Sequence, residues 1–139
     1  MAVGMRVGSN VWLIGSQDFL HSFFSTCAYR LERDGWGSRF PALQKHLYQG
    51  ELQPGDVPSA RAELATIQGE LKELPPSEVI WDIEELSTRP PWGDDISPEI
   101  TDLSNYFVTQ DGRDLFGVFD EALAYAERVG AGVAIQSAI

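Results

Sequence analysis

The fold class follows from residues 5–35, MRVGSNVWLIGSQDFLHSFFSTCAYRLERDG. Met5–Val7 and Val11–Ile14 carry the β-branched, apolar and aromatic residues that are typical of strands. Gly8-Ser9-Asn10 lies between them and has the composition of a tight turn. The sequence therefore predicts a β-hairpin at the start of the chain.

A helix is predicted directly after the hairpin, between Ser16 and Gly35. Ser16 is a favourable N-cap, and Asp18 brings a negative charge to the first turn, where the helix dipole stabilises it. Apolar residues then recur with the 3.6-residue period of a helix that buries one face. The predicted buried face consists of Phe19, Leu20, Phe23, Phe24, Cys27, Ala28 and Leu31. Cys27 is accordingly expected to be a core residue, because free cysteine is among the most buried residue types.

Two more helices are predicted before residue 75. A short one covers residues 40–49 and turns Leu43 and Leu47 inward. The next begins at the predicted N-cap Asp56 and ends at Pro75-Pro76. Its apolar face consists of Ala60, Leu64, Ile67, Leu71 and Leu74.

The second half of the chain contains the longest irregular segment. Residues 84–104 include three prolines and a glycine, which make a long helix or strand improbable there. The remaining predicted elements are a strand over 78–83, a strand over 105–109, a turn over 110–112, a helix over 113–128, and either a short last strand or a frayed tail over 133–135.

Consecutive helices between pairs of strands favour an α+β fold over a doubly wound parallel sheet. We therefore expect a small, mostly antiparallel sheet packed against three to four helices. The 139 residues suit one domain spanning 1–139, with 130–139 as a short strand or a tail.

The charge is strongly acidic and unevenly distributed. The chain has 10 basic and 21 acidic side chains, a net charge of −11. Residues 1–69 carry six of each sign, whereas residues 70–139 carry four bases and 15 acids. A protein without clustered cations is a poor binder of nucleic acid or of anionic membranes, so neither is an expected partner.

No motif for catalysis, cofactors or localisation stands out. His21 and His46 are the two histidines and Cys27 is the one cysteine, which excludes an internal disulfide and a cysteine-cluster metal site. Phosphate loops, dinucleotide fingerprints and nucleophile elbows are missing. No signal sequence or apolar span is recognised. We therefore expect a cytoplasmic protein with no cofactor and no catalytic residues.

Carboxylates in the irregular segment raise the question of a metal. Asp94, Asp95, Glu99 and Asp102 are the hard oxygen ligands that calcium and magnesium prefer. Their spacing does not match a calcium-binding loop. A solvated acidic loop is the favoured interpretation, and no metal site is predicted.

The candidate binding surface is residues 81–102, WDIEELSTRPPWGDDISPEITD. It combines an aromatic residue, Trp92, with carboxylates in a segment stiffened by proline, and a stiff segment loses less entropy on binding. Aromatic anchors with polar rims are typical of protein interfaces. The proposed contact residues are Asp82, Glu84, Glu85, Trp92, Asp94, Asp95, Glu99 and Asp102. In the alternative interpretation Trp92 folds back onto the core and the acids merely face solvent.

Several strings resemble the immunity protein 70 family of small bacterial proteins encoded beside polymorphic toxins. They are HSFFST (21–26), GSRFP (37–41), LYQG (47–50), VIWDIEEL (79–86) and PPWGDDISPEITDLSNYFVTQDGRDLF (90–116). The resemblance spans about residues 3–125, and the tail from Gly130 does not match. It implies that the protein binds and neutralises a cognate toxin domain, without enzymatic activity or a cofactor.

The acidic charge suggests independently that such a toxin has a basic face, for example a cationic nuclease cleft. Two alternatives remain open. One is a small hydrolase that uses carboxylates, and the other is a regulatory binding module unrelated to toxins. A homo-oligomer is compatible with the sequence but nothing supports it.

Overall fold

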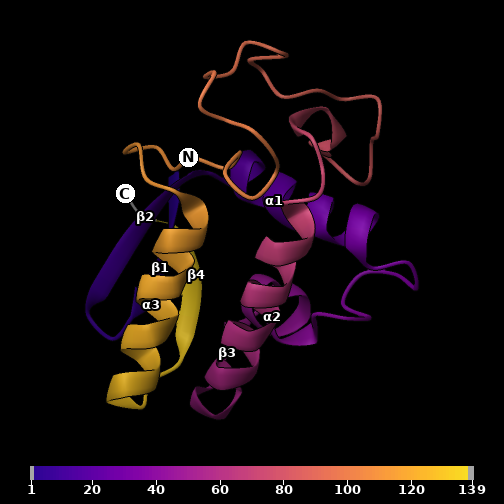
Figure 1. Ribbon diagram of the computed structural model, residues 1–139. Coiled ribbons are helices and arrows are strands. Elements are labelled where there is room, and N and C mark those ends of the chain that lie inside the picture. The colour runs from indigo at the N-terminus through magenta and orange to yellow at the C-terminus, as the bar shows by residue number, and fades with distance from the viewer. Residues whose placement is uncertain (1, 138–139) are drawn as a thin grey trace.

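The computed structural model describes residues 2–137 and has the predicted α+β fold. Four antiparallel strands form one sheet in the order β2-β1-β4-β3, and helices pack against it (Figure 1). The elements in chain order are β1 (Ala2–Val7), β2 (Asn10–Ser16), α1 (Gln17–Leu31), the π-helix η1 (Ala42–Leu47), β3 (Glu51–Leu52), the 3₁₀ turn η2 (Pro54–Asp56), α2 (Val57–Leu71), the 3₁₀ turn η3 (Pro76–Glu78), α3 (Leu115–Val129) and β4 (Val133–Ser137). The predicted small antiparallel sheet against several helices is confirmed.

The hairpin is formed by β1 and β2. Val7 pairs with Asn10, so the turn consists of Gly8 and Ser9, and Gly8 has the positive φ of 61° that glycine adopts without strain. Strand alternation buries Met5 and exposes Arg6, because successive side chains point to opposite faces. One face of the hairpin therefore belongs to the core.

Strand β4 lies in the middle of the sheet. Met5 on β1 pairs with Ile135, and Leu52 on β3 pairs with Val133. Gly130 in the left-handed conformation ends α3 and redirects the chain into this strand. Of the two interpretations of the C-terminal segment, the strand is the one observed; residues 138–139, like residue 1, lie outside the described residues.

The helices form as predicted where capping and periodicity agree. The Ser16 hydroxyl accepts a hydrogen bond from the Phe19 amide at 3.1 Å, which fixes the start of α1. Asp56 precedes α2 as expected, but its side chain makes no capping bond because residues 54–56 already form a 3₁₀ turn. The short helix predicted over 40–49 is present and contains η1, with Leu43 and Leu47 buried.

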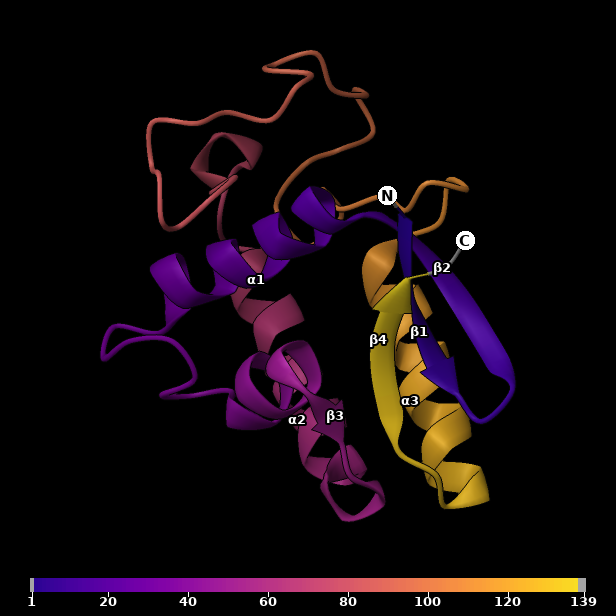
Figure 2. The ribbon, with the colours of Figure 1, turned by 180° about the vertical axis from the view of Figure 1, so that it is seen from behind.

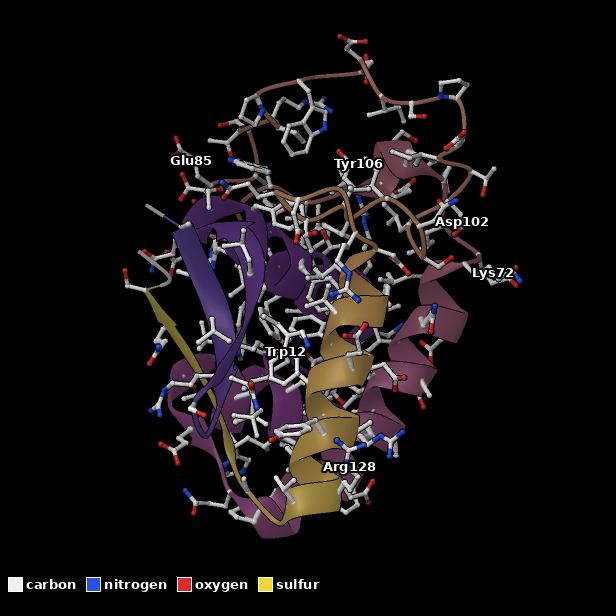
Figure 3. The ribbon with its side chains drawn as sticks, turned by 90° about the vertical axis from the view of Figure 1, so that its left-hand side faces the viewer. Trp12, Lys72, Glu85, Asp102, Tyr106 and Arg128 are labelled. Carbon is white, nitrogen blue, oxygen red and sulfur yellow. The ribbon has the colours of Figure 1, made fainter. Side chains whose placement is uncertain are left out.

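The core lies between the sheet and the helices. Helix α3 covers one face of the sheet, with Trp12 between them (Figure 3), and α2 lies beside α3 (Figure 1). Seen from behind, β4 and β1 lie in front of α3 (Figure 2). Phe23 on α1 is fully buried and its ring packs edge-on against Phe107 and Phe116 at 5.3 and 5.4 Å.

The strand predicted over 78–83 is wrong. Its backbone is extended at Val79, but the segment pairs with no strand, because hydroxyl groups of α1 bond to the amide and the carbonyl of Ile80. The β-branched and aromatic residues there reflect contact with the core rather than strand pairing.

The strand predicted over 105–109 is also wrong. It contributes one isolated bridge, between Val108 and Asp114, which closes the turn at Gly112. Asn105 uses its side chain to accept hydrogen bonds from the amides of Thr101 and Asp102, which curls the chain into turns instead.

Candidate functional site

The acidic loop, defined here as residues 82–102, lies at one end of the molecule beside α1 (Figure 1). It has no helix or strand of its own. Backbone bonds such as Gly93 N to Pro90 O and Asp95 N to Trp92 O, both 2.9 Å, fold it into successive turns. The loop is therefore a series of turns, and contacts with the rest of the fold position it.

Helix α1 holds the chain just before the loop. The Ile80 amide donates to the Thr26 hydroxyl at 3.0 Å, and the Ser22 hydroxyl donates to the Ile80 carbonyl at 2.8 Å. The Ile83 amide donates to the Ser25 hydroxyl at 3.2 Å. Three hydroxyl side chains of α1 thus bond to the backbone of Ile80 and Ile83, where a neighbouring strand would do so in a sheet.

The far end of the loop is attached to α2 and to β2. The Leu103 amide donates to the carbonyl of Leu74 at 2.9 Å, just beyond α2. The Gln110 amide donates to the Ile14 carbonyl at 2.8 Å, which joins the segment after the loop to the sheet. The loop is therefore fixed to three separate elements.

Negative charge is concentrated in the acidic loop because bases neutralise acids elsewhere. The loop contains seven acids and the single base Arg89. In the part of the chain that the structure describes, Arg30, Arg39, Arg61 and Arg113 pair with acids outside the loop. The loop therefore keeps most of its negative charge.

The eight residues proposed from the sequence divide by their surroundings. Five carboxylates are exposed, and two others make hydrogen bonds within the fold. The exposed ones are Glu84, Glu85, Asp94, Asp95 and Glu99.

Asp82 is bonded to an aromatic and histidine cluster that the sequence did not predict. His21 Nε2 lies 3.2 Å from Asp82 Oδ1, and His21 Nδ1 lies 2.7 Å from the Tyr48 hydroxyl. Burial, and then the nearby charges of Asp82 and Glu84, raise the pKa of Tyr48. The Tyr48 hydroxyl and the Asp82 carboxylate thus bond to the two nitrogens of one imidazole ring. The trio ties the start of the loop to α1 and η1.

Asp102 closes the other end of the loop. It accepts hydrogen bonds from the Ser104 hydroxyl, from the Ser104 amide at 2.8 Å and from the Thr101 hydroxyl at 2.9 Å. The Ser104 bond is the main cause that lowers the pKa of Asp102, and the charge of Lys72 adds to it. Figure 3 shows Asp102 near Lys72, and Glu85 toward the opposite side of the molecule, with Tyr106 between. Asp102 thus shapes the local turn.

Trp92 has an intermediate position. Its indole N–H donates to the Tyr106 hydroxyl at 2.9 Å, and its ring meets Trp81 edge-on at 5.4 Å. It still keeps 37% of its surface exposed. Trp92 is therefore fixed in place while one part of its ring faces solvent.

A cavity beside Trp92 was missed by sequence reasoning. It has a volume of about 590 Å³, and its walls come from the loop, the start of α1 and the segment after the loop. The apolar walls are formed by Phe19, Trp92, Ile96, Ile100, Tyr106 and Val108, with Asp95 at the same cavity. No local signal marks this cavity, since its walls are separated by more than 70 residues in the chain.

The structure also bears on the cysteine, on metal binding and on membrane-spanning helices. Cys27 is fully buried, as predicted, and burial raises the pKa of its thiol well above its usual value. Within residues 2–137 no three His, Cys, Asp or Glu side chains gather where they could hold a metal ion. No helix among the same residues is both long and apolar enough to cross a membrane.

Fold and site together define a small acidic α+β protein whose charge is concentrated on one irregular loop. The chain belongs to the Immunity protein 70 family, whose model matches residues 5–135. The match includes most of β4, which the sequence resemblance alone did not reach. Neither a curated protein nor a solved structure matches the chain. Family membership supports an immunity function, which implies a cognate toxin as partner and suggests a non-enzymatic role.

Proposed function

We propose that this protein neutralises its cognate toxin by binding it through the exposed part of the acidic loop. The contact surface consists of Glu84, Glu85, Trp92, Asp94, Asp95 and Glu99. The observation that supports this most directly is the concentration of exposed carboxylates around a fixed, half-buried tryptophan. Interfaces commonly combine such an aromatic anchor with a charged rim.

Asp82 and Asp102 have a different role in this proposal. Their carboxylates hold the two ends of the loop through His21 and Ser104. They position the contact residues, and they contribute to the toxin interaction mainly through the long-range electrostatic field of their charges.

The proposed partner surface on the toxin is basic. Unneutralised carboxylates on one loop raise the association rate with a cationic surface, and salt screens the effect within about 10 Å at 0.1 M. A toxin whose substrate is itself anionic, such as a nuclease, has a cationic cleft that this loop would cover. The proposal places both proteins in the cytoplasm, where the toxin acts, and includes no nucleic-acid or membrane partner for the immunity protein.

Charge reversal tests the surface. The double variant Asp94→Lys/Asp95→Lys should slow association with the cognate toxin domain by about 10-fold or more at low salt. The difference from the parent should shrink as salt is added. Stopped-flow association with the co-expressed and separated toxin domain measures both effects.

The matched control reverses two exposed acids outside the loop, Asp34→Lys/Glu51→Lys, with the same change in net charge. It should retain most of the parent's association rate. Equal slowing by the two double variants would show that net charge alone is responsible, and the surface assignment would be wrong.

A further inference from the structure

The cavity beside Trp92 has the size and the apolar lining of a binding site. It opens next to the acidic loop, and its volume of about 590 Å³ falls in the range of about 300–1,000 Å³ that is common for ligand sites. Its lining is mostly apolar, and two of the protein's exposed large apolar side chains, Trp92 and Val108, belong to it.

The walls of the cavity are preformed. Tyr106 is 6% exposed, and its hydroxyl accepts the Trp92 indole N–H, so the two rings hold each other. Phe19 is anchored by the Ser16 cap of α1. The segment carrying Val108 is joined to the sheet by the Gln110 amide. A site whose walls are already ordered loses little conformational entropy on binding.

Charge identifies the kind of occupant. Asp95 lines this cavity, and Asp94 lines a neighbouring cavity of about 420 Å³ that also touches Ile96 and Tyr106. A basic side chain beside the apolar one would pair with these carboxylates, whereas an acidic neighbour would be repelled. Arg89 lines the neighbouring cavity together with Asp94, whereas Asp95 is the charged side chain that lines the apolar cavity.

We propose that this cavity receives one large apolar side chain of the toxin, flanked in the toxin sequence by lysine or arginine. This rests on the proposed function and adds the chemistry of the bound segment. The apolar side chain packs between Phe19, Trp92 and Val108, and the flanking cations meet Asp94 and Asp95. The arrangement matches an interface in which a buried anchor is surrounded by a polar rim.

Short peptides test the site without the toxin. Acetyl-Lys-Phe-Lys-amide should shift the backbone amide signals of Ile96, Ile100 and Val108 in ¹⁵N–¹H spectra, with a dissociation constant on the order of 1 mM. Acetyl-Lys-Ala-Lys-amide lacks the anchor and should cause no saturating shift. Acetyl-Glu-Phe-Glu-amide should bind at least about 5-fold more weakly, because its charges face carboxylates. Equal binding of the acidic and basic peptides, or no binding of the basic one, would overturn the proposal.

A cavity-filling variant connects the site to the toxin. Val108→Trp places a large ring at the cavity from a position that is 44% exposed, so the core is not disturbed. The matched control is Val11→Trp, at a residue of β2 that is 48% exposed and does not line the cavity. Val108→Trp should abolish peptide binding and weaken toxin binding at least about 10-fold, whereas Val11→Trp should change neither.

The outcomes separate the two proposals. If the toxin binds the parent and Val108→Trp equally well while charge reversal at Asp94 and Asp95 weakens it, the proposed function stands and the cavity inference is wrong. If no toxin complex forms, the proposed function fails, and the peptide titration still decides the cavity's chemistry. A parent that dimerises in sedimentation and a Val108→Trp variant that is monomeric would show that a second copy fills the cavity, which also overturns the inference. Ser97→Phe, at another exposed lining residue, repeats the test if Val108→Trp fails to fold.

Discussion

Replacing Thr26 by valine removes one hydroxyl from α1 while keeping the shape of the side chain. The Thr26 hydroxyl accepts the Ile80 amide at 3.0 Å and lies 2.8 Å from the Ser22 carbonyl, within a buried site. In Thr26→Val the Ile80 amide loses its partner, while the Ile80 carbonyl keeps the Ser22 hydroxyl. A buried donor left unpaired costs about 1–3 kcal/mol. We therefore expect Thr26→Val to lower the free energy of unfolding by about that amount.

Urea denaturation measures this loss, and hydrogen exchange locates it. The Ile80 amide should exchange faster in Thr26→Val by more than the global destabilisation explains, because its bond is removed. Thr66→Val is the matched control, since the Thr66 hydroxyl bonds to the Ala62 carbonyl on an exposed helix surface. That control should change stability by about 0.5 kcal/mol or less. If the two variants were equally stable, the attachment of the loop to α1 through Thr26 would be refuted.

Three further predictions concern the rest of the fold. A bidentate hydrogen bond from Arg39 holds the pKa of Glu70 below its usual value. This pair therefore stabilises the folded state above about pH 4.3, and the stabilisation is lost as the pH falls. In urea denaturation, Glu70→Gln should be less stable than the parent by up to about 1 kcal/mol at pH 7 and equal to it near pH 2. Cys27 should not react with a thiol reagent at pH 8 until urea unfolds the protein, and rapid labelling of the native state would contradict its burial. Phe23→Ala should lower the free energy of unfolding by about 3–5 kcal/mol, because it leaves a cavity in the aromatic core. Tyr29→Ala, on the exposed side of the same helix, should lower it by less than about 1 kcal/mol. Equal losses of stability in a thermal melt would contradict the assigned core.

The sequence predicts elements well where local signals agree. The hairpin has its turn residues, α1 has the Ser16 cap and a clear apolar period, and α3 has a glycine at its end. The segments around Ile80 and Phe107 were predicted as strands because they are rich in β-branched and aromatic residues. That composition reports burial, and it cannot show that side chains of α1 would supply the hydrogen-bond partners.

The candidate site was predictable in charge but not in detail. Counting acids located the excess charge at residues 82–102, and the structure shows which carboxylates face outward. The separate roles of Asp82 and Asp102 depend on partners such as His21, which lies 61 residues from Asp82 in the chain. The cavity depends on Phe19 and Val108 meeting across the fold, and no sequence period records such a contact.

Hydrogen exchange of the purified complex with the cognate toxin domain is the most direct test of the proposed surface. We predict strong protection on binding at the amides of residues 92–97, with additional protection at residues 106–110. The backbone amides around Arg6 and Gln136, whose side chains bond to each other on an exposed face of the sheet, should exchange as in the free protein. Protection confined to that sheet face, with residues 92–97 exchanging as in the free protein, would contradict the account.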